Sequence, residues 1–358
     1  LIFLLPIRKI LKILFPPLAF CRKIGYNYPH ATTMKQKNRE TGMVRKNSTV
    51  TLKDIAQELG LSVKAVSTGL NGTGRLSPET RKRIQETALR MGYAPNAAAR
   101  SLVTHRSSFI GVLAPYLNSS FFGNIIAGIE EVAGEQDFTL LLDSLDFDAN
   151  RQRRVLSRLM QRNVDGIILY PQRHQLELAE NLKAIGVPVI QVMNHFTEFG
   201  EYAVTVDNLT GGREATEHLI GLGHSRIGFI AHDDESPELV DRHRGYDAAM
   251  HGHGLAEERF VRKCFMSIEA GREAALELLT RHPDITAIFA ASDVAALGTI
   301  QAALELGRRI PEELAIIGFD DLEIAAKQMI YPLSTMAQPK ERIGQLAARM
   351  MLDIFAGK

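Results

Sequence analysis

Small polar and cationic side chains between residues 62 and 68 have the types and spacing that can read DNA. Ser62, Lys64 and Thr68 lie within two turns of a segment that also holds the apolar Val63 and Val66. If the segment is helical, it can enter the major groove, about 12 Å wide, and present hydroxyl and ammonium groups to base edges. These residues therefore indicate nucleic-acid recognition.

The histidines, acids and glycines that could form a catalytic or metal site do not make a complete set. His251 and His253 alternate with glycines, which indicate a helix end more than a metal pair. The segment His232–Glu235 follows an apolar run and is interpreted as a solvated loop. Gly221 and Gly223 lack the third glycine and acidic partner of a dinucleotide fingerprint, and there is no P-loop. The other histidines have no nucleophile at suggestive spacing: His195, His218 and His224. The sequence predicts no enzyme, metal or cofactor; the only small molecule expected is an effector.

Three short amphipathic helices are predicted to position the DNA-reading segment. Each has a residue before its first turn that can cap it: Thr51, Ser62 and Ser77. The first helix is predicted to stop at Gly60, the second near Asn71, and Pro78 occupies the first position of the third. A helix, a glycine-containing turn and a second helix form the helix-turn-helix pattern. An unspecialised three-helix module is the alternative.

Charge divides the chain into unlike parts. Of its 358 residues, 45% are hydrophobic and 23% charged, which is ordinary for a globular protein. Residues 43–108 contain eleven Lys/Arg against four Asp/Glu, whereas residues 109–358 contain 23 against 36. A basic N-terminal part on an acidic body indicates that only one part meets a polyanion. The two cysteines, Cys21 and Cys264, exclude a disulfide framework and indicate a reducing compartment.

The first 48 residues are predicted to be an extension outside the fold. Residues 1–20 are apolar but interrupted by Arg8, Lys9, Lys12 and three prolines. This pattern fits neither a secretory signal nor a membrane-spanning helix. A weakly membrane-attracted cationic helix is the alternative, and Met34 and Met43 are plausible starts.

The remainder of the chain has the pattern of an α/β protein. Short apolar runs such as FIGVLA, VDGIILY, RIGFIA and LAIIGF alternate with amphipathic stretches. The stretches expected to be helical are residues 122–136, 149–162, 211–222 and 293–307. Such alternation predicts doubly wound parallel sheets with helices on both faces. Two subdomains are expected, with a boundary near residues 190–205 and a return near 320–335.

The N-terminal segments VTLKDIAQELGLSVKAVSTGLNG and RLSPETRKRIQETALRMGYAPNAAARSL resemble the DNA-binding head of the lactose/galactose repressor (LacI/GalR) family over its whole length. The resemblance implies a helix-turn-helix domain over residues 49–93 and a hinge helix with linker over 94–107. Thr68 replaces the arginine common in this family, so the operator is expected to differ from the usual half-site. The implied DNA contacts are Thr51, Ser62, Val63, Lys64, Ala65, Ser67, Thr68, Asn71, Tyr93, Asn96, Ala99 and Leu102. In the family, the hinge leucine, here Leu102, wedges into the minor groove.

The acidic body resembles the effector-binding core of the same family, a relative of periplasmic sugar-binding proteins. The resemblance is carried by IGVLAPYLNSSFFGNIIAGIE, DRHRGYDAAM, FAASDVAALGTIQAALELG and IPEELAIIGFDD. It implies an effector-binding and dimerisation domain over residues 108–358, expected to be truncated because the family continues past the last helix with another strand. Arg242 would anchor the ligand, Asp293 would accept its hydrogens, and Phe121 and Phe122 would stack on it. Further implied contacts are Ser236, Glu238 and Met266.

Together these features predict a ligand-responsive, sequence-specific transcriptional regulator, a repressor of sugar or related metabolic genes. The expected partners are a palindromic double-stranded DNA operator, a sugar-like effector and a second copy, with a tetramer left open. The expected location is cytoplasmic and nucleoid-associated, with no membrane partner. A solute-binding protein without DNA function is the main alternative, but it would need an export signal. An enzyme on a doubly wound fold is a second.

Overall fold

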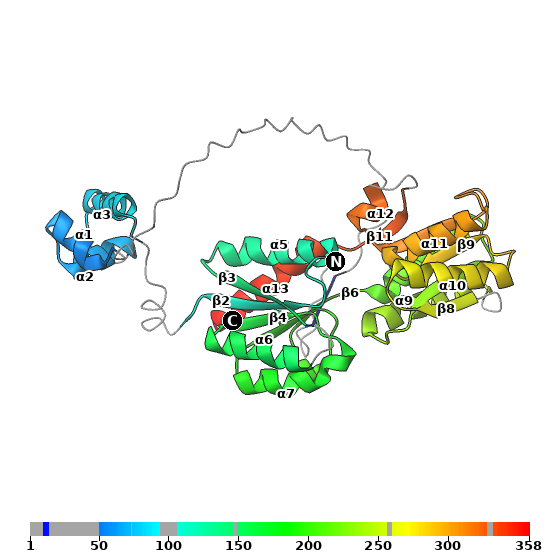
Figure 1. Cartoon of the computed structure of the whole chain (residues 1–358), viewed down its shortest axis with the longest axis horizontal. Coiled ribbons are helices and arrows are strands. Elements are labelled where there is room, and N and C mark those ends of the chain that lie inside the picture. Colours follow the sequence, from blue (N-terminus) through cyan, green and yellow to red (C-terminus); the bar gives the residue numbers. More distant parts are fainter. Residues whose placement is uncertain are drawn as a thin grey trace, which may run out of the picture. The chain divides into compact units, whose positions relative to one another are not determined.

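The structure, a computed structural model, describes residues 10–13, 50–72, 74–93, 106–145, 149–255, 260–327 and 332–358 (Figure 1). They belong to two units. The smaller one is a helical head, and the larger one contains two parallel sheets with helices on both faces. This arrangement confirms the predicted α/β fold class with a small all-α head. Within the described ranges, every helix is too short or too polar to span a bilayer.

The head consists of three helices whose starts follow the predicted capping residues. Thr51 Oγ1 accepts a hydrogen bond from the Asp54 N–H, and the Asp54 carboxylate accepts one from the Thr51 N–H. Ser62 Oγ likewise accepts from the Ala65 N–H, at 3.1 Å. These bonds satisfy backbone donors that the first helical turn leaves open. The helices are α1 (Leu52–Leu59), α2 (Val63–Leu70) and α3 (Pro78–Met91).

A small apolar core holds the head together. Ile55, Val66 and Ile84, one from each helix, are fully buried. Gly69 lets α2 pack closely on α3, because a Cβ at this position would lie 2.5 Å from Ile84 Cδ1. This packing leaves the opposite side of α2 open, with Lys64 exposed.

The first sheet of the larger unit is entirely parallel, in the order β1-β6-β5-β4-β2-β3. Figure 1 shows α5 and α13 on one face and α6 and α7 on the other. Ile168 packs toward α5 and α13, whereas its neighbours Ile167 and Leu169 pack toward α6 and α7. The strands are β1 (Ile10–Ile13), β2 (Phe109–Ala114), β3 (Thr139–Ser144), β4 (Gly166–Leu169), β5 (Val189–Met193) and β6 (Ala203–Val206). The helices are α5 (Ser120–Gly134), α6 (Ala149–Gln161), α7 (Leu176–Ile185) and α13 (Lys340–Phe355), with 3₁₀ turns η1 (Arg173–Gln175) and η2 (Thr197–Phe199).

Strand β1 differs from the expectation that residues 1–48 stand outside the fold. Ile10–Ile13 pair in parallel with Ala203–Val206 at the edge of the first sheet. The segment ILKI has the β-branched residues that favour strands, and the edge of β6 offers unpaired backbone groups. An interrupted apolar segment can therefore add to a sheet although it fits no targeting signal.

The second sheet is also parallel, in the order β11-β10-β9-β7-β8. Helices α8 and α9 cover one face, and α10 and α11 cover the other. The strands are β7 (Ile227–His232), β8 (Phe260–Cys264), β9 (Ala287–Ala290), β10 (Ala315–Asp320) and β11 (Ser334–Ala337). The helices are α8 (Asn208–Gly221), α9 (Pro237–Gly252), α10 (Ile268–Arg281), α11 (Asp293–Glu305) and α12 (Glu323–Lys327).

We call the part built on the first sheet the first subdomain and the part built on the second sheet the second subdomain. The chain enters the second subdomain after Val206 and returns after Ala337. The crossings lie just past the predicted ranges of 190–205 and 320–335. All four predicted helical stretches correspond to helices: α5, α6, α8 and α11.

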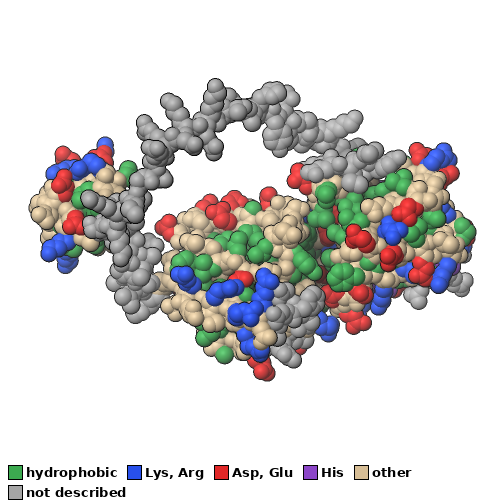
Figure 2. All heavy atoms as spheres, viewed as in Figure 1, with side chains coloured by type: hydrophobic (Ala, Val, Ile, Leu, Met, Phe, Trp, Pro, Cys, Tyr) green, Lys and Arg blue, Asp and Glu red, His purple; other side chains and the backbone are tan. Residues whose placement is uncertain are grey.

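The surface of the larger unit carries both signs of charge despite its net negative sequence. Figure 2 shows Lys and Arg side chains gathered over the region of α6. The exposed arginines of this helix are Arg151, Arg153, Arg154 and Arg158. The body is therefore negative in total, although the face over α6 carries positive charge.

Candidate functional site

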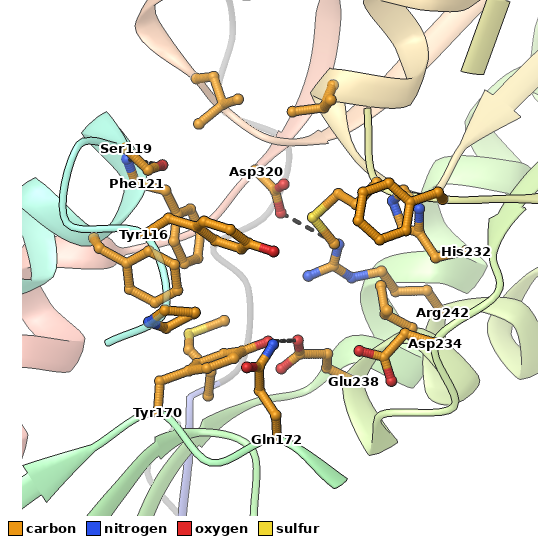
Figure 3. Close-up of a pocket in the computed structure, with 18 of the residues that line it drawn as sticks. Tyr116, Ser119, Phe121, Tyr170, Gln172, His232, Asp234, Glu238, Arg242 and Asp320 are labelled. Carbon is orange, nitrogen blue, oxygen red and sulfur yellow. Dashed lines mark hydrogen bonds and ion pairs between the residues drawn. The ribbon is translucent and has the colours of Figure 1, made fainter. Parts of the chain in front are cut away.

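A pocket lies where strands of both subdomains end (Figure 3). Its cavity volume is about 140 Å³. The carboxyl ends of parallel strands are the usual place for ligands in α/β folds. The first subdomain contributes Pro115, Tyr116, Ser119, Phe121, Phe122, Tyr170, Gln172 and Met193. The second contributes His232, Asp233, Asp234, Glu238, Leu239, Arg242, Phe265, Met266, Val294, Asp320 and Leu322.

Arg242 is the buried cation of the pocket, on α9 and only 3% exposed. Its Nε donates to Asn208 Oδ1 at 2.9 Å, and its Nη1 donates to the Ala291 carbonyl at 2.6 Å. Nη1 also lies 3.2 Å from Asp320 Oδ1. The guanidinium carbon is 3.8 Å from the centre of the Phe319 ring, within cation–π distance. These contacts fix the guanidinium plane, so it can present remaining N–H groups to a ligand in one orientation.

Glu238 lies on the same helix and is bonded across the cleft. Its Oε1 accepts a hydrogen bond from the Tyr170 hydroxyl, which comes from the end of β4 in the first subdomain. Its Oε2 is buried without a partner in the described structure. Burial raises the pKa of Glu238 to about 7, while Arg242 and the Tyr170 bond oppose that rise. Burial, and then the Glu238 charge, raise the pKa of Tyr170 further above its ordinary value.

His232, the last residue of β7, is a second buried polar group on the wall. Its Nε2 lies 2.8 Å from Ser292 Oγ, and its Nδ1 has no partner among the described residues. Burial, helped by the Arg242 charge, lowers the pKa of His232 to about 4. The ring is therefore neutral near pH 7, and its open nitrogen can donate a hydrogen bond to a ligand or accept one from it.

Aromatic rings form much of the opposite wall. Phe122 meets Tyr170 edge to face, with ring centres 5.1 Å apart at an interplanar angle of 77°. Phe121 meets Phe122 similarly, at 5.3 Å and 82°. Both phenylalanines line the pocket, as the family resemblance implied. They provide apolar faces against which a ring compound can pack.

The structure does not place Asp293 on the pocket wall. Its side chain is fully buried, and its Oδ2 accepts from the Leu322 N–H at 2.7 Å. Its Oδ1 accepts from the Thr335 hydroxyl at 2.5 Å. Asp293 therefore holds the loop after β10 in this structure, and its direct contact with a ligand stays a prediction. Asp320 is the acid that lines the cavity on this side.

Ser236 also lies off the wall. Its hydroxyl donates to Asp234 Oδ1 at 2.8 Å, and the side chain is fully buried. It precedes α9 and shapes the loop that carries Asp234. Of the implied ligand contacts, the structure brings together Phe121, Phe122, Glu238, Arg242 and Met266.

The sequence motifs did not identify several wall residues. His232, interpreted from the sequence as part of a solvated loop, is instead the buried last residue of β7. Tyr170, His232 and Asp320 each stand at the end of an apolar run, and this position was the available signal. The backbone there is unusual, because Met193, Asp320 and Asp321 have positive φ values of 71°, 115° and 53°. Such conformations are uncommon for residues other than glycine and cluster at functional sites.

The second candidate surface is the exposed side of α2 in the head. Val63 is 45% exposed although it is apolar, and Lys64 beside it is exposed. Ala65, Ser67 and Thr68 are partly exposed, and the capping residues Ser62 and Asn71 on either side of the helix are exposed. Thr51 caps α1, and Tyr93 packs on the head core. Three implied DNA contacts lie outside the described residues: Asn96, Ala99 and Leu102.

The part of the chain that the structure describes holds no cluster of three or more His, Cys, Asp or Glu that could bind a metal ion. Its buried cysteine, Cys264, has a pKa raised to about 11, chiefly by burial. A thiol of this kind is a poor nucleophile at neutral pH.

Comparison with known proteins gives the same division of the chain. Residues 51–96 match the profile described as bacterial regulatory proteins, lacI family. Residues 107–358 match the profile described as periplasmic binding proteins and sugar binding domain of LacI family. These two regions coincide with the helical head and the two-sheet unit.

Whole-length relatives support this assignment. The chain is 35% identical over 298 residues to the HTH-type transcriptional regulator DegA of Bacillus subtilis, covering 82% of this chain and 88% of DegA. It is 33% identical over 304 residues to the ribose operon repressor of Haemophilus influenzae, covering 85% and 91%. The solved complex of the transcriptional regulator CelR with cellobiose has a TM-score of 0.64 at 29% identity, covering 86% and 94%. The chain thus belongs to the LacI family of bacterial regulatory proteins and is a DNA-binding transcriptional regulator with a sugar-binding-type core.

Proposed function

We propose that this regulator acts as a homodimeric repressor whose grip on a palindromic operator is set by a sugar-like ring compound in the pocket. The observation that carries the proposal is the pairing of two features in one chain. One is a capped helix-turn-helix with Val63 and Lys64 exposed on its second helix. The other is a pocket between two subdomains with Arg242 fixed at its centre.

The chemistry of the walls supports a polyhydroxylated ring as the effector. Aromatic faces of Phe121 and Phe122 suit an apolar ring surface, whereas Arg242, Glu238 and Asp320 offer donors and acceptors for hydroxyl groups. Relatives point the same way, since one is named for a ribose operon and another is solved with cellobiose. We infer a sugar or sugar derivative, without a bound metal or cofactor.

The position of the pocket supplies a mechanism. A ligand that touches Tyr170 in the first subdomain and Arg242 in the second favours an arrangement in which the subdomains are close together. The polypeptide crosses between them after Val206 and after Ala337, and these crossings are natural hinges. In a dimer, a change in the angle between subdomains would alter the spacing of the two heads.

A second copy is proposed to pack against the edge strand β3. None of the residues of β3 is buried, and Leu142 is 47% exposed. An unpaired edge with apolar side chains is normally covered. A two-fold dimer would present two α2 helices to half-sites about one helical turn apart, and the operator would share this symmetry.

The test is DNA binding by the full chain, measured by fluorescence anisotropy on a duplex selected from a random library. We predict a palindromic site and a steep, linear fall of log affinity with log salt, because bound phosphates release counterions. Lys64→Ala should weaken DNA binding. If Lys64 contacts a phosphate, the slope of log affinity against log salt should become shallower by about 1. If Lys64 contacts a base, the variant should select a less strictly defined sequence.

Lys82→Ala is the matched control. Lys82 is exposed on α3 and pairs with Glu86 at 3.9 Å, away from α2. It should leave the site and its affinity nearly unchanged. If no duplex is enriched at low salt, or if the two variants behave alike, α2 is not the DNA-reading helix.

A further inference from the structure

Glu238 has one oxygen held by protein and one oxygen free. Oε1 accepts from the Tyr170 hydroxyl, and the Glu238 N–H donates to Asn194 Oδ1 at 3.3 Å, so two residues of the first subdomain hold this residue of the second. Oε2 is buried without a hydrogen-bond partner in the described structure. Figure 3 places the carboxylate at the cavity, between Tyr170 and Arg242. The residue is only 6% exposed, so solvent does little to satisfy the free oxygen.

Among the described residues, Glu238 is the buried carboxylate of the cavity whose negative charge has no cation of its own. The cation Arg242 is already paired with Asp320 at 3.2 Å and bonded to Asn208 and the Ala291 carbonyl. Asp234, exposed at the rim, adds negative charge on the same side. The described wall residues include one cation, Arg242, and four acids: Asp233, Asp234, Glu238 and Asp320. A ligand that brings another negative charge would meet repulsion in a poorly solvated site.

We propose that Glu238 selects the effector by charge, so that the pocket accepts uncharged or amine-bearing ring compounds and rejects their carboxylated or phosphorylated analogues. The ligand group that the pocket recognises is a hydroxyl or ammonium that donates to Glu238 Oε2. This inference rests on the proposed function of the pocket as the effector site.

The buried carboxyl fits this role better than a purely structural one. A structural carboxylate in a core has both oxygens satisfied, as Asp293 does with Leu322 and Thr335. Glu238 lacks that second set of bonds, and burial raises its pKa to about 7 against the effects of Arg242 and Tyr170; Asp320 and Asp234 add to the rise. A ligand donor at Oε2 would supply the missing bond and favour the ionised form.

The decisive variant is Glu238→Gln. The glutamine keeps an oxygen for the Tyr170 hydroxyl and places an amide nitrogen, a donor, where Oε2 stood. It therefore reverses the hydrogen-bonding sense of the open atom without changing size. Glu235→Gln is the matched control, because it makes the same substitution at an exposed glutamate three residues away that does not line the pocket.

The probes are matched sets of one sugar in four forms: glucose, glucosamine, glucuronate and glucose 6-phosphate, with the equivalent galactose and ribose forms where they exist. Binding to the full chain is measured by calorimetry at one pH near 7. For the wild type we expect a neutral or amine form to bind at least about tenfold more tightly than its anionic forms. In Glu238→Gln, binding of the amine form should weaken about tenfold and binding of the carboxylate should strengthen. Glu235→Gln should change the ratios of affinities by less than about threefold.

Three results overturn the proposal: an anionic form that binds the wild type more tightly than its parent, unchanged preferences in Glu238→Gln, or no binding by any probe. Tyr170→Phe guards against misfolding of Glu238→Gln, since it keeps the carboxylate and should retain the charge preference at lower affinity. DNA binding is measured on the same preparations. Variants that hold DNA but ignore the probes contradict the charge filter and leave the DNA-binding function intact.

Discussion

At the scale of single residues, the pocket holds acids at a cost to stability. Burial raises the pKa of Glu238 to about 7 and also raises that of Asp293. In the unfolded chain such groups titrate near 4. The folded state therefore binds more protons between about pH 4 and pH 7, and the free energy of unfolding falls as the pH rises through this range.

We predict that Glu238→Gln makes the free energy of unfolding less dependent on pH. A shift of the pKa from about 4.3 to about 7 corresponds to roughly 4 kcal/mol of unfolding free energy, which the wild type loses between pH 4 and pH 8 and the variant keeps. Urea unfolding of both proteins at several pH values measures this difference. Asp234→Asn, at the exposed rim, should follow the wild type. Parallel pH profiles for the wild type and Glu238→Gln would show that the carboxyl is solvated.

The sequence could identify some of these residues but not which of their side chains face the cavity. The resemblance located Arg242, Glu238 and the two phenylalanines, and the structure places all four on the pocket wall. It implied Asp293 as the acid that accepts ligand hydrogens and did not point to Asp320, which lines the cavity. Asp320 has a φ of 115°, a conformation that local propensity does not predict for an aspartate.

At the scale of elements, a pair of glycines positions the helix that carries Arg242. A Cβ on Gly245 of α9 would lie 2.3 Å from the Leu209 carbonyl oxygen of α8. A Cβ on Gly212 of α8 would lie 2.3 Å from the Arg242 carbonyl oxygen. Side chains at these positions would push the helices apart, because backbone atoms cannot move aside as side-chain ends can.

Gly245→Ala should therefore destabilise the protein by about 1–3 kcal/mol and weaken ligand binding by displacing Arg242. Gly252→Ala, in the same helix, meets nothing within 4 Å and should be neutral or stabilising by up to about 1 kcal/mol. Chemical unfolding of both variants gives the comparison. Equal effects would mean that the α8–α9 contact is loose enough to absorb a methyl group.

Element prediction was strongest where local signals agreed. All three head helices begin after their predicted caps, since Ser or Thr side chains satisfy the open N–H groups of the first turn. Short strands were weaker targets: β6, β8 and β11 contain only four or five residues, with polar residues among them. Pairing with neighbours, which is non-local, makes these segments strands.

At the scale of the whole molecule, the protein joins a basic head to a ligand-binding core. The head region carries a net positive charge and the body a net charge of −13, so binding to DNA should depend on salt mainly through the head. If the pocket controls the head, the ligand must bind the DNA-bound protein and the DNA-free protein with different affinities. Linkage then requires the effect to be reciprocal.

The effect of the ligand on DNA affinity and the effect of DNA on ligand affinity can both be measured with the full chain. DNA affinity is determined with and without a ligand found in the calorimetric screen, and ligand affinity is determined with and without saturating DNA. We predict that both change by one common factor, on the order of 5- to 150-fold. If the ligand binds tightly in the pocket and neither affinity changes, the pocket does not control the DNA-binding head, and the central claim is contradicted.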